Sequence, residues 1–153
     1  MSSFISDFGK SLARDIDTLS REVALYPDDA SLWAERPGLP NTGGNLTIHL
    51  IGNVRHFIGH VLGGSSYVRD RDHEFAARSG SRDEIQALIA AAKTEVAAAV
   101  AGFTDATMDT PFPVALGGVT LPTHAILMHL ATHFTFHLGQ IDYHRRIVTG
   151  NPQ

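Results

Sequence analysis

The stretch His129-Leu-Ala-Thr-His133-Phe-Thr-Phe-His137-Leu-Gly-Gln140 carries three imidazoles at intervals of four residues. On an α-helix, side chains four residues apart lie along one slanting stripe, roughly 6 Å from one another. A second stripe with 3-4-4-3 spacing predicts the buried side of the same helix and consists of Leu127, Leu130, Phe134, Leu138 and Ile141. The sequence therefore predicts one long helix over residues 121–150 with an apolar face and a histidine face.

The ends of this helix are also marked in the sequence. Thr120 is a candidate N-cap, and Pro122 suits the first turn, where the missing N–H of proline costs nothing. Gly150, followed by Pro152, predicts the end of the helix.

Three further helices are predicted from apolar periodicity. The first covers residues 4–26 and is stopped by Pro27; its core positions are Ile5, Phe8, Leu12, Ile16, Leu19 and Val23. The second covers residues 45–62, with a core stripe of Leu50, Val54, Phe57 and Val61 beside Leu46, Ile51 and Ile58. The third covers residues 81–101, because Ser81-Arg-Asp-Glu84 is a capping box, and its core positions are Ile85, Leu88, Ala92, Val96 and Val100.

The connections between these helices are long. Residues 27–44 are rich in proline and glycine and predict an ordered loop, in which Trp33 is expected to plug one end of the bundle rather than bind a ligand. The run Arg69-Asp-Arg-Asp72-His-Glu74-Phe75 alternates in charge and predicts a solvated, salt-bridged loop. Gly117-Gly118, between β-favouring residues, predicts a small hairpin before the last helix.

Four amphipathic helices with long connections predict an all-α fold, a four-helix bundle with long crossover connections. The chain of 153 residues, 43% of them hydrophobic, is expected to form a single domain over residues 1–153.

Composition narrows the classes of function. The net charge is −4 and no block of lysine or arginine occurs, which argues against a nucleic-acid partner. No signal peptide or membrane-spanning run is recognisable, so we expect a cytoplasmic protein without a membrane partner. Cysteine is absent, which leaves nitrogen and oxygen as the only metal ligands and excludes a cysteine nucleophile.

The histidines predict a metal site inside the bundle. Two histidines four residues apart on one helix, with a third from a facing helix, give three imidazole ligands and leave positions for water or substrate. The second helix offers several candidates, since His49, Asn53, His56 and His60 follow one another at 4-3-4 spacing. Spacing alone does not choose among them. A di-iron carboxylate site is excluded because no helix carries the Glu-x-x-His pairs that it needs.

The chain resembles the DinB-like superfamily of metal-binding four-helix bundles. The resemblance spans nearly the whole chain and rests on three segments: Asn41-Thr-Gly-Gly-Asn-Leu-Thr-Ile-His49-Leu-Ile-Gly-Asn53-Val-Arg55, Arg69-Asp-Arg-Asp-His-Glu-Phe75 and His129-x-x-x-His133-x-x-x-His137-x-Gly-Gln140-Ile141. It implies that the metal is held by one histidine of the second helix and two of the fourth, which here are His49, His133 and His137. His56, His60 and His129 then become neighbours, with His129 one turn from His133.

The resemblance also implies a reaction class. Relatives include transferases and isomerases that use a divalent metal and a low-molecular-weight thiol such as bacillithiol or mycothiol, so we expect a thiol-dependent S-transferase type of activity on a small molecule, and a homodimer. A metal-dependent hydrolase and a non-catalytic metal- or ligand-binding bundle are the alternatives. Imidazole ligands suit several metals; we expect zinc or nickel ahead of iron or manganese. Asp72, Glu74 and Asp142 are candidates for a general base by residue type only.

Overall fold

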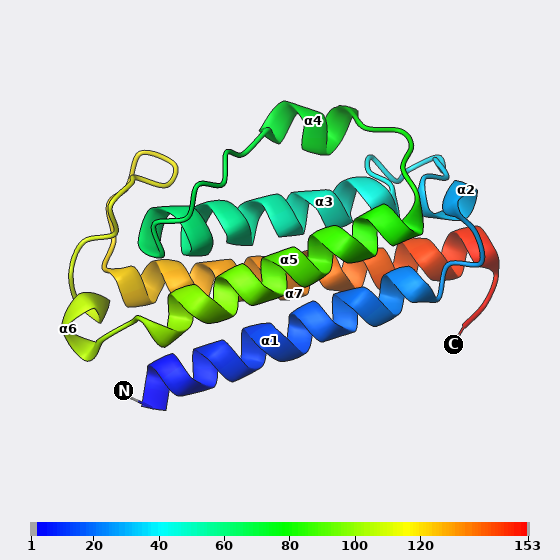
Figure 1. The fold of residues 1–153 in the computed structure, drawn as a ribbon. Coiled ribbons are helices and arrows are strands. Elements are labelled where there is room, and N and C mark those ends of the chain that lie inside the picture. Colours follow the sequence, from blue (N-terminus) through cyan, green and yellow to red (C-terminus); the bar gives the residue numbers. More distant parts are fainter. Residues whose placement is uncertain (1–2, 153) are drawn as a thin grey trace.

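The computed structural model describes residues 3–152 and is built from helices (Figure 1). The long elements are α1 (Ser3–Ala24), α3 (Gly43–Val54) continued by the π-helix η1 (Arg55–Leu62), α5 (Arg82–Ala101) and α7 (Thr123–Thr149). Three short helices lie in the connections: α2 (Asp29–Leu32), α4 (Arg71–Ala76) and α6 (Asp105–Met108). No β-strand occurs among these residues, so the prediction of an all-α four-helix bundle is confirmed.

The four long elements run up, down, down and up. In Figure 1, α1 and α7 run in one direction and α3 and α5 in the other. α1 packs on α5 and α7, and α3 packs on α7 and α5. Because α3 and α5 are parallel, the chain between them must return along the length of α3, and it carries α4 across the outer side of that helix. This crossover is the feature of the fold that shapes the site.

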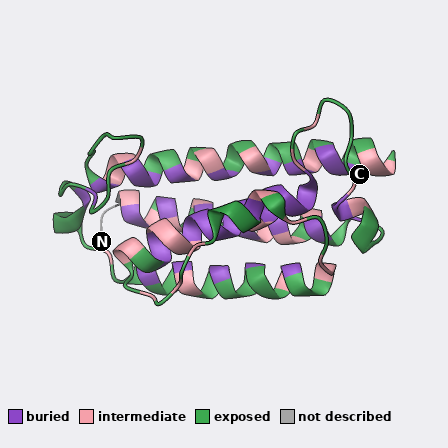
Figure 2. Ribbon diagram, turned by 90° about the horizontal axis from the view of Figure 1, so that it is seen from above, coloured by how far each residue is buried: buried purple, intermediate pink, exposed green. Residues whose placement is uncertain are grey.

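The core lies where the four long elements face one another, and Figure 2 shows buried residues along their inner sides. All six apolar positions predicted for α1 and all five predicted for α7 are buried. In α5, the predicted Leu88 is 40% exposed and Val100 is half-buried, whereas Ile89 and Ala99 are buried. The predicted core positions from Leu88 to Val100 are spaced by four residues each time. Each step of four residues moves a side chain about 40° around an α-helix, so such a series drifts away from the core. The alternation 85, 89, 92, 96 and 99 keeps to one face.

The second long helix changes its winding at Arg55. A π-helix pairs residues five apart, so side chains after Val54 turn away from the positions that an α-helix would give them. Ile58 is buried, and the predicted core residues Phe57 and Val61 are half-buried. η1 also approaches α5 closely, since a Cβ added to Gly63 would lie 2.6 Å from the Cβ of Ala99. The alanine-rich helix is therefore a close-packing surface, as its composition suggests.

The connections match the predictions in part. Trp33 is buried, donates a hydrogen bond from Nε1 to the carbonyl of Gly80 at 2.8 Å, and packs on Gly44, which fits the predicted plug. The hairpin is a single bridge between Leu116 and Val119, closed by glycines with φ of 59° and 80°. The N-cap of α7 is Pro122 and not Thr120, and Gly150 ends the helix in the left-handed conformation, with φ of 68°.

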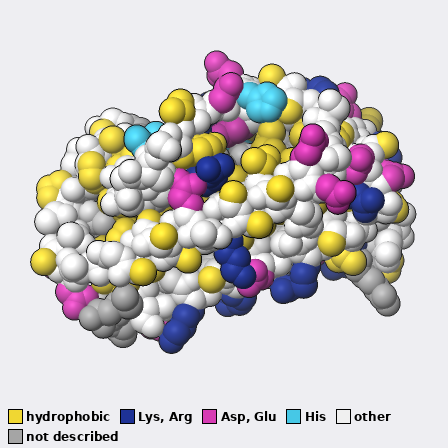
Figure 3. Space-filling model, viewed as in Figure 1, with side chains coloured by type: hydrophobic (Ala, Val, Ile, Leu, Met, Phe, Trp, Pro, Cys, Tyr) yellow, Lys and Arg dark blue, Asp and Glu magenta, His cyan; other side chains and the backbone are white. Residues whose placement is uncertain are grey.

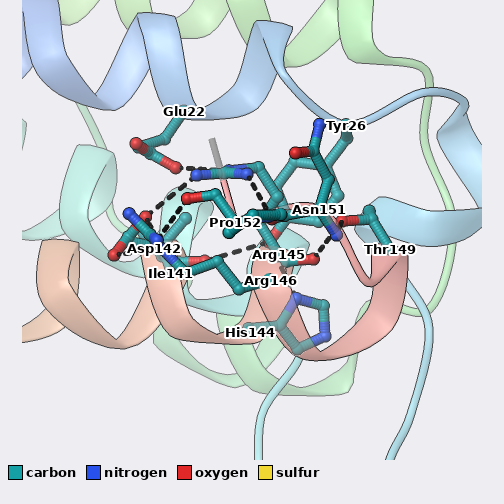
Figure 4. A network of polar contacts seen from close by, with 10 residues as sticks. All are labelled: Glu22, Tyr26, Ile141, Asp142, His144, Arg145, Arg146, Thr149, Asn151 and Pro152. Carbon is teal, nitrogen blue, oxygen red and sulfur yellow. Dashed lines mark hydrogen bonds and ion pairs between the residues drawn. The ribbon is translucent and has the colours of Figure 1, made fainter.

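A polar network fixes the C-terminal end of α7 to α1 (Figure 4). Arg145, only 1% exposed, donates to Glu22 Oε2 at 2.7 Å and to Asp142 Oδ1 at 2.9 Å. Beside it, the Tyr26 hydroxyl lies 2.7 Å from His144 Nδ1, and His144 Nε2 lies 2.8 Å from the carbonyl of Ala34. This network joins the connection between α1 and α3 to the ends of α1 and α7.

Charge is distributed in small pairs over the surface. On the face seen in Figure 3, acidic and basic side chains lie intermixed. Ion pairs join separate elements, as between Lys93 and Asp17 and between Arg82 and Asp29. Among residues 3–152, no helix has both the length and the apolar character needed to cross a lipid bilayer.

Candidate metal centre

Three imidazoles converge between α3 and α7. His49 projects from α3, and His133 and His137 come from successive turns of the antiparallel α7. Their ring centroids are 5.1 Å (His49 to His133), 5.2 Å (His49 to His137) and 4.6 Å (His133 to His137) apart. One nitrogen of each ring lies within 4.8 Å of the other two, so this cluster could hold a metal ion.

The spacing and the chemistry of these donors fit a divalent ion. His49 Nε2 lies 3.3 Å from His133 Nε2. Two imidazole nitrogens at about 2.0–2.1 Å from a tetrahedral zinc ion are about 3.3 Å apart, so this pair already has the spacing of shared ligands. Neutral imidazole nitrogens suit several transition metals.

Two of the rings have an oxygen beside Nδ1. His49 Nδ1 lies 2.9 Å from Glu74 Oε2, and His137 Nδ1 lies 2.6 Å from Gln140 Oε1. An acceptor at Nδ1 keeps the proton there and leaves the lone pair of Nε2 directed into the cluster. Metal-binding histidines in proteins are held in this way.

Glu74 is 4% exposed and lies on α4, within the crossover that passes over α3. Arg69 donates to both of its oxygens, from Nε at 2.7 Å and from Nη2 at 2.8 Å. Burial raises the pKa of the Glu74 carboxyl, but the hydrogen bonds from His49 and Arg69 outweigh burial and bring the pKa below its ordinary value. Glu74 is therefore a buried carboxylate that orients His49.

This arrangement corrects the prediction for residues 69–75. The charged run predicts a solvated loop, whereas Glu74 is buried and the ring of Phe75 lies 4.8 Å from that of His49. Gly52, three residues after His49, permits this contact, since a Cβ at Gly52 would lie 2.1 Å from Glu74 Oε1. A residue without a side chain is needed there for the carboxylate to reach the histidine.

The cluster keeps the imidazoles of His133 and His137 neutral. Burial, together with the neighbouring rings of His137 and His49, lowers the pKa of His133 to about 4. Burial also lowers the pKa of His137, against the effect of its hydrogen bond to Gln140. The neutral form is the one that ligates a metal, so these two rings are ready to bind at neutral pH.

The remaining candidate histidines lie outside the cluster. His129 is exposed, with its ring centroid 6.1 Å from that of His133. His56 and His60 stack on each other at 5.9 Å, on the π-helix that turns them from the face of His49. In the described part of the chain, His49, His133 and His137 form the only group of three or more potential ligands brought this close together.

None of the carboxylates considered as a general base is free beside the cluster. Asp72 is exposed, and Asp142 accepts hydrogen bonds from Arg145 and Arg146 at the end of α7. Both oxygens of Glu74 are occupied.

A cavity of about 130 Å³ is lined in part by Gln140, the hydrogen-bond partner of His137. Leu39, Pro40, Leu46 and Tyr143 supply its apolar lining. Leu39 and Pro40 also border a second cavity of about 370 Å³, whose outer rim carries charged side chains: Glu35, Arg36 and Arg78. One residue of the smaller cavity, Gln140, thus lies about one helical turn from His137 on α7.

The fold and the site together define an all-α bundle with a three-histidine candidate metal centre between two antiparallel helices. A family model described as the DinB superfamily matches residues 11–141, and the chain belongs to this superfamily. No curated protein matched the chain.

Solved structures of two similar proteins share this fold. A DinB-like protein from Bacillus cereus ATCC 10987 is 20% identical, with a TM-score of 0.72 over 93% of this chain and 91% of that protein. A histidine-to-alanine mutant of a mycothiol-dependent maleylpyruvate isomerase is 16% identical, with a TM-score of 0.67 over 92% of this chain. The match covers 63% of the isomerase, so the isomerase contains additional chain.

Proposed function

We propose that this protein is a divalent-metal-dependent enzyme that joins an external low-molecular-weight thiol to a small electrophilic substrate. His49, His133 and His137 are the metal ligands in this proposal. The observation that carries it is the convergence of only three nitrogen donors in the described part of the chain. Structural zinc sites have four protein ligands, whereas catalytic sites have three and keep a position open.

The ion, when bound, supplies Lewis-acid chemistry that favours the deprotonated form of a thiol or water at neutral pH. The chain itself orients the ligands: Glu74 and Gln140 keep protons on the Nδ1 atoms of His49 and His137. The mostly apolar cavity lined by Gln140 is the proposed site of the electrophile. Zinc or nickel is the proposed ion, ahead of iron or manganese.

An external thiol is proposed because the chain contains no cysteine. Fold similarity to a mycothiol-dependent isomerase supports a thiol as the partner. A serine or threonine nucleophile would require an adjacent base, and the carboxylates considered above are exposed or engaged elsewhere. The proposed partners are therefore a thiol and a small electrophile.

A metal-dependent hydrolase is the second candidate, favoured by the same open set of ligands. Metal-loaded protein is to be incubated with panels of electrophiles and of esters and amides, with and without a low-molecular-weight thiol. Turnover that requires the thiol and is lost in His133→Ala supports the transferase. Ester or amide turnover at an equal rate without thiol, lost in the same variant, replaces it with the hydrolase; no turnover in any panel supports a non-catalytic bundle.

The cavity offers a second test of the same proposal. Leu46 is buried in its wall, so Leu46→Trp should fill it and raise KM for the electrophile while metal content stays unchanged. Leu88→Trp on the exposed side of α5 is the matched control. An unchanged KM in Leu46→Trp would remove this cavity from the substrate site.

A further inference from the structure

Two buried polar side-chain atoms among the described residues have no hydrogen-bond partner: Asn53 Oδ1 and His133 Nδ1. Asn53 is 7% exposed. Leaving a buried polar group unpaired costs free energy, so two such atoms near one candidate site require an explanation.

The protons on the three imidazole rings explain why these two atoms are unpaired. When all three Nε2 atoms face a cation, each Nδ1 carries a hydrogen that needs an acceptor. Glu74 provides the acceptor for His49, and Gln140 provides it for His137. His133 alone has none, while the carbonyl oxygen of Asn53 is an acceptor without a donor.

The position of Asn53 along its helix points to the same ring. Asn53 follows His49 by four residues, so it lies one turn further on the same side of α3. α7 runs antiparallel to α3, and one turn forward on α3 corresponds to one turn back on α7, from His137 toward His133. Asn53 therefore lies at the level of His133 and away from His137.

We propose that Asn53 is a positioning residue for His133, whose Nδ1–H it holds through one buried water molecule. The two atoms do not bond directly, and a water that donates to the asparagine oxygen and accepts from the imidazole satisfies both. This inference rests on the proposed metal site. It gives every ring of the cluster its own acceptor: a carboxylate for His49, a side-chain amide for His137, and an amide with its water for His133.

The test uses Co²⁺-loaded full-length protein and proton NMR in water, in which the Nδ1–H protons of ligating imidazoles give shifted, exchangeable signals. Wild-type protein should show three such signals protected from solvent exchange. Asn53→Leu should lose the His133 signal by rapid exchange and weaken Co²⁺ binding by about 10-fold or more. Gln140→Leu is the matched control, because it removes the acceptor of His137 and should abolish a different signal.

Metal-free stability separates this role from a structural one. Asn53→Leu replaces the buried oxygen with an apolar group of similar size and removes the need for the bridging water, so it should leave the Tm of the metal-free protein unchanged or higher. Asn53→Asp keeps the acceptor and should retain all three signals; if Asn53→Leu does not fold, comparing this variant with Asn53→Val gives the same contrast. Three unchanged signals in an apolar variant would overturn the inference, whereas a wild-type protein that binds no Co²⁺ would instead overturn the proposed metal site.

Discussion

His49 Nδ1 lies 2.9 Å from Glu74 Oε2, across 25 residues of sequence. The two side chains meet because the crossover between parallel α3 and α5 passes back over α3. Arg69, from the same crossover, donates to the second oxygen of Glu74. The contact sets the proton of His49 on Nδ1 and leaves Nε2 facing His133. The outer connection thus shapes the interior cluster.

Glu74→Gln should lower the metal affinity by about 10- to 100-fold, because the neutral amide is a weaker acceptor for His49 Nδ1–H. It should also lower the Tm of the metal-free protein, since Arg69 loses its buried carboxylate. Competition with a chelating dye measures the affinity. Asp72→Asn, on the exposed side of the same helix, is the control and should leave both values unchanged. Equal affinities for Glu74→Gln and wild type would show that the carboxylate does not support His49.

Gly52→Ala should weaken metal binding without touching a ligand. The added Cβ would lie 2.1 Å from Glu74 Oε1, so the carboxylate must move away from His49. Gly139→Ala on α7 is the matched control: a Cβ there meets no atom within 4 Å, and alanine favours a helix by roughly 0.5–1 kcal/mol over glycine. Chelator competition and thermal unfolding of both variants check this. A Gly52→Ala protein that binds metal as tightly as Gly139→Ala would contradict the close approach of Glu74.

The metal-free protein should become less stable as the pH falls from about 6.5 to about 4. Burial, with the neighbouring rings, lowers the pKa of His133 to about 4 in the folded state, whereas in the unfolded chain it titrates near 6.5. Between these pH values the unfolded state binds more protons than the folded state, so the free energy of unfolding decreases as the pH decreases. His133→Gln should reduce the slope in urea unfolding measured across this range. His129→Gln, at an exposed position, should not; identical slopes for His133→Gln and wild type would contradict the lowered pKa.

The sequence predicted most of the fold because apolar periodicity is a local signal. α1 and α7 are long and regular, and their predicted core residues are the observed ones. The π-helix escaped prediction because its wider winding depends on packing against α5, where Gly59 and Gly63 approach Glu95 and Ala99. The period of the second helix was therefore read as α-helical beyond Val54.

The candidate site was predicted less completely. Spacing identified the stripe of His129, His133 and His137. The family resemblance selected His49, His133 and His137 as ligands, and the structure brings these three rings together. Glu74 was missed as a partner of His49, because a contact across the crossover leaves no periodic signal in the sequence. Gly52 and the hydrogen bond of Gln140 to His137 acquire meaning only once α4 and α7 are placed.

We expect the protein to form a homodimer. Several large apolar side chains of α7 are more than half exposed, namely Met128, Phe136, Tyr143 and Ile147. Light scattering at micromolar concentration should return twice the chain mass of 16.5 kDa. Phe136 is 64% exposed. If this face of α7 is the dimer interface, Phe136→Glu should shift the protein toward the monomer. A monomer mass for the wild-type protein would contradict the expectation.

In the proposed metal centre, one divalent ion binds to His49, His133 and His137. Metal analysis of protein prepared without a histidine tag or a nickel column tests it most directly, on wild type and on single alanine variants. We predict about one ion per chain in wild type, none in His49→Ala, His133→Ala or His137→Ala, and unchanged content in His56→Ala and His60→Ala. Loss of metal in His56→Ala or His60→Ala, with metal retained in His49→Ala, would contradict it.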